Sequence, residues 1–193
     1  MGWQTKTDLR QRYLSARNAL PNPSRDSASK HICSLVAQHT VFLRAHMVHC
    51  YLSMGSEVDT HPLISHALAI GKRVCIPVWE RHSDATAATE ITSLETGTFA
   101  TGAFGLAVPR VIQTIALDEI DLMIVPLLAY MELPAITGAP PTAHRLGYGA
   151  GYYDRLLSRT TAPRIGVAFA MQRTNALPIE PHDQLLDQVI TNE

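Results

Sequence analysis

The residues whose types and spacing could do chemistry gather in segment 145–155, which reads RLGYGAGYYDR. Three glycines alternate in it, at Gly147, Gly149 and Gly151. Alternating glycines can adopt positive φ angles that turn backbone N–H groups toward one point, and a helix that follows them adds its positive N-terminal end. The segment therefore predicts a binding site for an anion such as phosphate.

Charged residues near the glycines extend this interpretation. Arg145 would add a fixed positive charge at the mouth of the site, and Asp154, about one turn into the helix, could hold magnesium bound to the same phosphates. Asp183 supplies a second carboxylate from a stretch suited to a loop before the last strand. Magnesium commonly takes one or two carboxylates together with phosphate oxygens and water. The combination fits a nucleoside triphosphate.

Two common nucleotide motifs do not match this segment. The Gly-Lys-Ser/Thr ending of a P-loop is missing, and Tyr152 stands where the dinucleotide fingerprint has its third glycine. A purely structural interpretation also stays open from the residues alone. In it the glycines form a turn, Asp154 complements the start of a helix, and Asp183 is an ordinary surface or capping aspartate.

The elements that must position these residues follow from periodicity. Apolar residues spaced three and four apart predict helices over 9–20, 24–36 and 60–70, and a further helix is expected over 151–157. Compact or β-branched apolar runs predict strands at 47–52, 73–77, 88–94, 121–125, 164–170 and 188–191. Segments 96–109 and 133–144 contain Gly and Pro without periodicity and are expected to be loops.

Alternating strands and helices predict the fold class. Such β-α-β units close by right-handed crossovers into a mostly parallel sheet with helices on both faces. With 193 residues, 46% of them hydrophobic, the chain suits one compact domain. We therefore expect an α/β fold in which residues 1–193 form a single-domain three-layer sandwich.

Composition excludes several classes of protein. The net charge of −1 and pI near 6.7 favour neither nucleic acid nor an anionic membrane as partner. The first 45 residues are locally basic, which indicates either a solvated helix face or a phosphate-bearing ligand nearby. The basic residues there are Lys6, Arg10, Arg12, Arg17, Arg25, Lys30 and Arg44, against Asp8 and Asp26.

The cysteines and the apolar segments of the sequence indicate the cellular compartment to expect. Cys33, Cys50 and Cys75 are far apart and lack metal-ligand spacing, so they are expected to be reduced and packed in apolar surroundings, as in the cytoplasm. The N-terminus lacks the apolar core of a signal peptide. The longest apolar run, 122–130, is interrupted by Pro126 and is too short to span a bilayer.

On these residues the sequence resembles the 5-formyltetrahydrofolate cyclo-ligase family, also called 5,10-methenyltetrahydrofolate synthetase. The family hallmark R-L-G-x-G-x-G-Y-Y-D is 145–154 here. Further similar segments, in the same order along nearly the whole chain, are 6–10, 51–60, 71–77, 121–126, 165–172 and 182–191. Two departures stand out: Ala150 replaces a glycine common in bacterial members, and the Pro-rich segment after Tyr130 is longer than usual.

The resemblance implies a role for each site residue. Magnesium would be held by Asp154 and Asp183, and Lys6 and Arg145 would act in catalysis. The implied ATP-binding residues are Lys6, Arg10, Arg145, Leu146, Gly147, Tyr148, Gly149, Ala150, Gly151, Tyr152 and Tyr153. The implied folate-binding residues are Leu52, Glu57, Tyr148 and Tyr152. A carboxylate such as Glu57 can accept paired hydrogen bonds from the amino-pyrimidinone end of a pterin, although without the resemblance a solvent-side loop position would be favoured.

The implied reaction is the ATP- and magnesium-dependent conversion of 5-formyltetrahydrofolate to 5,10-methenyltetrahydrofolate, with release of ADP and phosphate, by a monomeric cytoplasmic enzyme of one-carbon metabolism. ATP would phosphorylate the formyl oxygen, and N10 would then close the ring. Two alternatives remain at this stage. One is a non-catalytic relative that binds folate or nucleotide, and the other is a sugar-phosphate isomerase or acyl-CoA enzyme on a similar sheet.

Overall fold

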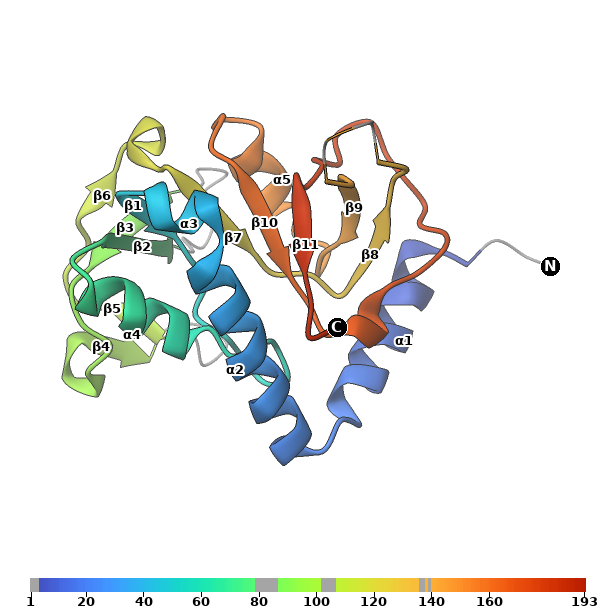
Figure 1. Cartoon of the computed structure of the whole chain (residues 1–193), viewed down its shortest axis with the longest axis horizontal. Coiled ribbons are helices and arrows are strands. Elements are labelled where there is room, and N and C mark those ends of the chain that lie inside the picture. The colour runs from blue at the N-terminus through green and yellow to red at the C-terminus, as the bar shows by residue number, and fades with distance from the viewer. Residues whose placement is uncertain (1–3, 79–86, 102–106, 136–137, 139) are drawn as a thin grey trace.

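The computed structural model of the chain describes residues 4–78, 87–101, 107–135, 138 and 140–193 (Figure 1). The first part contains α1 (Lys6–Asn18), α2 (Asn22–Gln38), α3 (Thr40–Arg44), β1 (Met47–His49), α4 (His61–Ala69) and β2 (Arg73–Val78). The second part contains β3 (Ala87–Ile91), β4 (Phe99–Thr101), β5 (Ala107–Pro109), β6 (Thr114–Ile115), β7 (Leu122–Val125), β8 (Ala129–Glu132), β9 (Ala143–Leu146), α5 (Tyr152–Leu157), β10 (Arg164–Val167) and β11 (Gln188–Ile190).

A mostly parallel sheet forms the centre, as the sequence predicts. Seven strands of the described residues join in the order β11-β10-β7-β1-β2-β3-β6. The pairs from β11 to β2 are parallel, and β3 and β6 are antiparallel to their neighbours. The chain proceeds from β1 to β2 on one side and returns to β7 on the other. The winding therefore reverses between β1 and β7, and ligands of open α/β sheets bind beyond the carboxyl ends of the strands at such a point.

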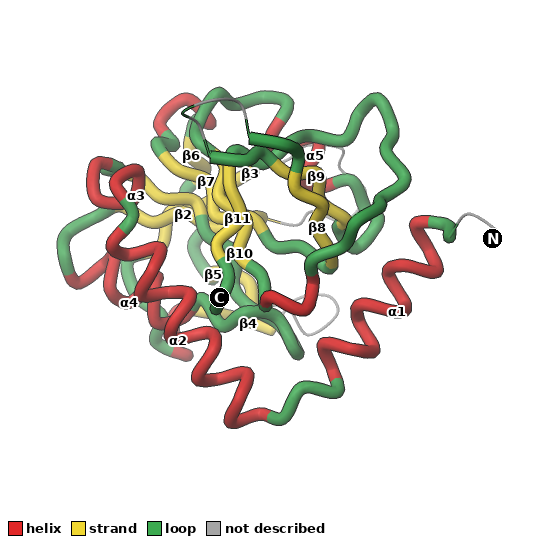
Figure 2. The backbone as a smooth tube through the Cα atoms, turned by 45° about the vertical axis from the view of Figure 1, so that its right-hand side comes forward, coloured by secondary structure: helices red, strands yellow, loops and turns green. Residues whose placement is uncertain are grey.

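Both faces of the sheet are covered. In β7, Leu122 and Ile124 belong to one apolar cluster, whereas Met123 and Val125 belong to the other, because successive side chains of a strand point to opposite faces. Helices α2, α3 and α4 supply the first cluster and lie together along one side of the sheet (Figure 2). Helix α5 and the β8–β9 hairpin supply the second. The prediction of a three-layer sandwich is confirmed.

Helix α1 stands apart from these layers. It diverges from α2 (Figure 1), and its Leu9 and Tyr13 pack against Leu128, Ala129 and Leu146 beside the β8–β9 hairpin. Its first turn is closed by a capping box between Thr5 and Asp8. The basic residues of this helix are thereby brought to segments far away in the sequence.

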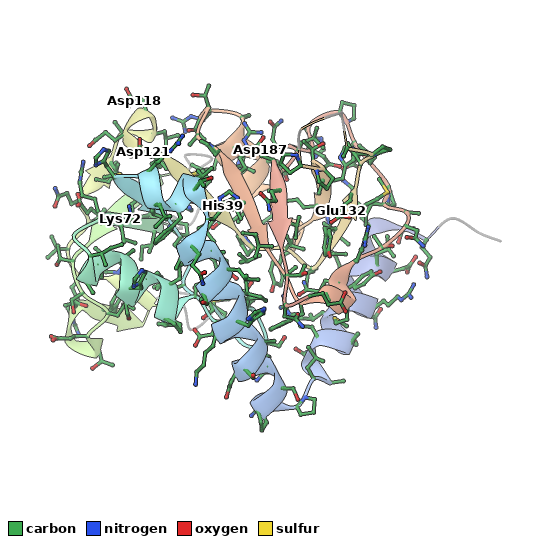
Figure 3. The ribbon with its side chains drawn as sticks, in the orientation of Figure 1. His39, Lys72, Asp118, Asp121, Glu132 and Asp187 are labelled. Carbon is green, nitrogen blue, oxygen red and sulfur yellow. The ribbon has the colours of Figure 1, made fainter. Side chains whose placement is uncertain are left out.

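Aspartates fix the amino ends of the strands. The carboxylate of Asp121 accepts hydrogen bonds from the backbone N–H groups of His46 and Met47, at 2.8 and 2.9 Å. Asp187 accepts one from the N–H of Arg164, at 2.7 Å. Figure 3 shows both aspartates at the upper edge, where β1 and β10 begin. The opposite edge, where these strands end, is left for a ligand.

Two segments expected to be loops contain strands. Within 96–109, β4 and β5 form an antiparallel pair. Within 133–144, β9 begins at Ala143 and pairs with β8, so that Tyr130 lies opposite Arg145. Residues 102–106, 136–137 and 139 lie outside the described part. These expectations were wrong because such short strands depend on a partner elsewhere in the chain rather than on local periodicity.

Helix and strand ends also differ from the prediction. Helix α2 begins at Asn22 rather than after Ser24, with Pro23 in its first turn, where the missing N–H does no harm. The strand predicted at 47–52 ends at His49, and the residues after it form a loop. None of the helices in the described part of the chain has both the length and the apolar character needed to cross a membrane.

Candidate active site

A cavity of about 460 Å³ lies beyond the carboxyl ends of the central strands. Its walls come from the loop after β1, the end of β2, Pro126 after β7, the glycine loop 145–151, α1 and segment 180–183. The volume is typical of small-ligand sites. The cavity thus occupies the place that the reversal of winding between β1 and β7 predicts.

The structure brings all of the predicted site residues together. Those that line the cavity are Lys6, Arg10, Leu52, Glu57, Arg145, Leu146, Gly147, Tyr148, Gly149, Ala150, Gly151, Tyr152, Tyr153, Asp154 and Asp183. They come from the first helix, the loop after β1 and the last third of the chain. Which ligand each residue binds stays a prediction.

The glycine loop has a conformation that glycine permits. The φ angles of Gly149 and Gly151 are +103° and +65°, in the left-handed region, whereas Gly147 is not among the glycines with positive φ. Arg10 lies against the loop: its Nε donates to the carbonyl oxygen of Gly147 at 2.9 Å, and a Cβ added to Gly149 would meet its guanidinium carbon at 3.1 Å. Helix α5 has only six residues, so its N-terminal end does not by itself make an anion site.

Opposite charges neutralise one another at this end of the cavity. The Nζ of Lys6 lies 2.7 Å from a carboxylate oxygen of Asp183 and 2.8 Å from one of Glu180. Burial lowers the pKa of Lys6, but the bonds to these two carboxylates outweigh it and leave that pKa raised. Burial likewise raises the pKa of Asp183, but Lys6 and the N–H of Glu180 outweigh it and leave it lowered.

A second ion pair adjoins the first. Arg145 is almost wholly buried and donates to Oδ1 of Asp154 at 2.7 Å. The same oxygen accepts from the backbone N–H of Gln184 at 3.1 Å. That bond ties the hallmark aspartate to the residue directly after Asp183. The two predicted metal ligands are therefore held by one connected network, and each already has a cationic partner.

Segment 180–183 adds residues that the sequence prediction missed. Ligand atoms of Glu180, His182 and Asp183 lie within 4.8 Å of one another, and all three residues line the cavity. The local sequence contained a signal, because Glu180 and His182 stand beside Asp183 in the same loop. We call the part of the cavity formed by Lys6, Arg145, Asp154, Glu180 and Asp183 the charged end.

The other end of the cavity is built around one buried carboxylate. Glu57 is 8% exposed; its Oε1 accepts from the hydroxyl of Tyr148 at 2.7 Å and its Oε2 from the N–H of Met54 at 2.9 Å. Burial raises the pKa of Glu57, and these two bonds and the charge of Arg17 oppose the rise. The lining of the same cavity includes the apolar residues Tyr51, Leu52, Met54, Ile76, Pro77 and Val78. We call this the carboxylate end.

Some buried polar atoms of β1, the glycine loop and α5 have no hydrogen-bond partner within the described part of the chain. Both ring nitrogens of His49, the hydroxyl of Tyr153 and the Nε of Arg145 are buried and lack hydrogen-bond partners among the described residues. The rings of His49 and Tyr153 meet edge to face, with centroids 5.9 Å apart. Burial lowers the pKa of His49 to about 3, so its imidazole is neutral.

The fold and the cavity define a class: an α/β protein with a ligand site at the reversal of winding, where a glycine loop and paired charges face a buried carboxylate. Comparison with known families gives the particular member of that class. The model of the 5-formyltetrahydrofolate cyclo-ligase family matches residues 3–192, and the chain belongs to this family. The resemblance drawn from segment 145–154 is confirmed.

Individual relatives agree over nearly their full length. The 5-formyltetrahydrofolate cyclo-ligase of Mycolicibacterium smegmatis is 29% identical over 198 residues, covering 99% of this chain and 95% of the relative. That of Escherichia coli is 29% identical over 181 residues, covering 91% and 93%. The solved structure of Aquifex aeolicus 5,10-methenyltetrahydrofolate synthetase matches with a TM-score of 0.80 at 28% identity, over 97% of this chain and 90% of that one. This is a family of enzymes, as the sequence analysis expected.

Proposed function

We propose that the chain converts 5-formyltetrahydrofolate to 5,10-methenyltetrahydrofolate, using ATP and magnesium and releasing ADP and phosphate. The observation that carries this proposal is the division of one cavity into a charged end and a carboxylate end. A triphosphate suits the glycine loop and the cations, and a pterin suits a buried acceptor with apolar walls. The reacting parts of the two substrates, the triphosphate and the pterin, would therefore meet in one cavity.

The chemistry explains why ATP is needed. The formyl group of the substrate is an amide, so its carbon is a poor electrophile and its oxygen a poor leaving group. Transfer of the γ-phosphoryl group to the formyl oxygen gives an iminium phosphate and ADP. N10 then attacks the formyl carbon and loses its proton to solvent, and inorganic phosphate departs with the formyl oxygen. No side-chain nucleophile is required; positioning and charge stabilisation suffice.

The chain's own residues would supply that positioning. Lys6 and Arg145 would contact the transferred phosphoryl group and stabilise its charge, and Arg10 would keep the glycine loop in place. To do so, Lys6 would exchange a bond to Asp183 for one to a phosphate oxygen, and Arg145 could do the same with Asp154. At the other end, free lone pairs of Glu57 would accept N–H donors of the pterin, with Leu52, Tyr148 and Tyr152 around the ring.

Magnesium fits the residues that would hold it. Asp154 and Asp183 offer carboxylate oxygens, the ligand type that magnesium prefers, and both line the cavity beside the glycine loop. When bound, the ion would neutralise charge on the phosphates. The carboxylates that now pair with Lys6 and Arg145 would turn to it, since the phosphates would take over those cations.

The deciding experiment mixes the purified protein with 5-formyltetrahydrofolate and follows the near-ultraviolet absorbance of the methenyl product. We expect absorbance to rise only when ATP and magnesium are both present. ATP binding without product would favour a non-catalytic relative, and product formation without ATP would exclude the proposed reaction. Neither an isomerase nor an acyl-CoA enzyme would give this signal.

Compartment and assembly belong to the same proposal. Cys33, Cys50 and Cys75 are free and buried, which suits a reducing cytoplasm. The cavity described above is lined by residues of one chain, so a monomer suffices to form it. Light scattering of the purified protein would test the monomer.

A further inference from the structure

Arg17 of α1 is a buried charge outside the cavity lining. It is 2% exposed, and its guanidinium donates to the Oγ of Ser56 at 3.0 Å, to the carbonyl oxygen of Leu127 at 3.4 Å and to the hydroxyl of Tyr148. Within the described residues no carboxylate lies at ion-pairing distance from it. Burying an unpaired arginine is unfavourable, so its position calls for an explanation.

In each of the two hydrogen bonds of the Tyr148 hydroxyl, the donor and the acceptor can be assigned. A guanidinium can only donate, so the Tyr148 oxygen must accept from Arg17. The single hydroxyl proton is then available for Glu57, whose Oε1 lies 2.7 Å away. Arg17, Tyr148 and Glu57 form a relay in which every donor points toward the carboxylate. Such a relay favours the ionised carboxylate, which accepts only.

We propose that Arg17 is a positioning residue for folate recognition: acting through Tyr148, it holds Glu57 as an oriented, acceptor-only carboxylate for a substrate ring with adjacent N–H donors. This inference rests on the proposed function, because it takes the carboxylate end as the pterin site. Arg17 itself need not touch the substrate. Since Tyr148 belongs to the glycine loop, the relay also joins the two ends of the cavity.

Arg17 is the charged group that affects the pKa of Glu57, because the other titratable groups around Glu57 are neutral tyrosines. The titratable groups that face it are Tyr51 from its own loop, Tyr148 from the glycine loop and Tyr153 from α5, and burial raises the pKa of all three tyrosines. They are neutral at ordinary pH. Arg17, from α1, is the cation that opposes the effect of burial on Glu57. Its removal should let burial raise the pKa of Glu57 further.

The experiment compares Arg17→Met with Arg164→Met. Arg164 is a partly buried arginine that donates to the carbonyl oxygens of Leu157 and Thr160 at the opposite edge of the sheet, so it controls for losing such a side chain. Equilibrium binding of 5-formyltetrahydrofolate and of magnesium-ATP would be measured separately between pH 5.5 and 9, together with Tm.

We expect Arg17→Met to weaken folate binding by roughly 10-fold at neutral pH and to change ATP binding by less than about 3-fold, on the scale of one lost charged hydrogen bond. The pH below which folate binding is lost should move upward, because Glu57 ionises at higher pH. Arg164→Met should keep the wild-type affinity and pH profile. Equal weakening of both ligands with an unshifted pH profile would show a merely structural role and overturn the inference.

A second variant covers the case in which Arg17→Met fails to fold. Tyr148→Phe keeps the ring but breaks the relay, and it should produce the same upward shift in the pH profile of folate binding. An unshifted profile in that variant would also overturn the inference. Wild-type protein that forms no product refutes the proposed function instead, and is recognised in the parallel absorbance assay before any variant is compared.

Discussion

Buried charges at the two ends of the cavity are stabilised by different kinds of partner. At the charged end Lys6 pairs with Asp183, and Arg145 pairs with Asp154, at 2.7 Å each. At the carboxylate end Glu57 receives only neutral donors directly, and its nearest cation, Arg17, acts from behind Tyr148. A charged ligand at the charged end would therefore compete with the protein's own ion pairs. A ligand at the carboxylate end adds to an acceptor that is already oriented.

This difference has a consequence for substrate binding. Because the charged end is internally neutral, ATP without a metal would leave carboxylates next to phosphates, and a metal without ATP would leave cations without partners. The two should therefore bind together much better than either alone. The carboxylate end involves no such competition, so folate should bind to it without ATP.

The largest effect should come from breaking the charged end. Asp154→Asn removes a proposed metal ligand and the partner of Arg145, and we expect kcat/KM for ATP to fall by at least about 100-fold, the scale of losing one preorganised electrostatic group. Folate binding should change by less than about 3-fold. Steady-state kinetics and folate titration would measure the two. Unchanged ATP turnover would exclude Asp154 as a ligand. Asp118→Asn, at the opposite edge (Figure 3), is the control.

A substitution at the carboxylate end should weaken folate binding and leave ATP binding unchanged. Glu57→Gln keeps the shape of the side chain but loses the charge, and we expect the Kd for 5-formyltetrahydrofolate to rise about 10- to 100-fold. The KM for ATP should stay close to wild type. Isothermal titration with each ligand tests this, with Glu132→Gln, whose carboxylate pairs with Arg173 on the hairpin, as the control. A parallel loss of ATP binding would mean that the two ends are not distinct.

A smaller effect should follow from crowding the glycine loop. Gly149→Ala combines left-handed strain, about 1 kcal/mol, with a Cβ that meets the guanidinium of Arg10 at 3.1 Å. We expect ATP affinity to fall about 10-fold as Arg10 is displaced, since one charged hydrogen bond is of that scale. Gly71 also has a positive φ, +78°, but a Cβ added to it would have no neighbour within 4 Å. Gly71→Ala should also lower the melting temperature, but it should keep ATP affinity. Equal ATP affinities for the two variants would show that Arg10 does not hold the loop.

The smallest effect on ligands should come from His49, a buried residue of β1. His49→Leu removes two buried nitrogens without partners, and we expect the free energy of unfolding at pH 7 to rise by about 1 kcal/mol. Both ligand affinities should stay unchanged. Urea unfolding measures the first quantity; lower stability would show that the imidazole has partners, such as ordered water.

The pH dependence of the same variant gives a second check. In the folded protein burial lowers the pKa of His49 to about 3. The unfolded chain takes up the proton near pH 6.5, so folding is opposed as the pH falls below that value. Between pH 7 and pH 5 this should remove about 2 kcal/mol from the stability of the wild type, and His49→Leu should lack that loss. Parallel pH profiles would contradict the assignment.

The sequence predicted much of the charged end because its residues belong to local patterns. The alternating glycines, Arg145 and Asp154 fall within ten consecutive positions, and the positive φ angles at Gly149 and Gly151 agree with the expectation from their spacing. The parallel strands were also predictable, since their apolar runs are buried on both faces, as the burial of β7 shows. Local information sufficed in both cases.

The remaining features depend on contacts between distant segments. Arg17 stood in a basic stretch that reads equally well as a solvated face, and only the approach of Tyr148, 131 positions away, reveals its burial. The β8–β9 hairpin was missed because its connection is rich in proline and glycine, although Tyr130 and Arg145 pair across it. His49 lies in an apolar strand, where sequence alone does not tell whether its nitrogens find partners.

The docking of α1 on the β8–β9 hairpin has a consequence for the order of events during synthesis. Lys6 meets Asp183 across 177 positions, and Arg10 meets Gly147 across 137. A ribosome must therefore release nearly the entire polypeptide before the helix made first can reach its final place. The two main apolar clusters, neither of which includes α1, also depend on the end of the chain, because they contain Ile190 and Leu186. The fold and the cavity lining are therefore both completed only when the last segment of the chain has left the ribosome.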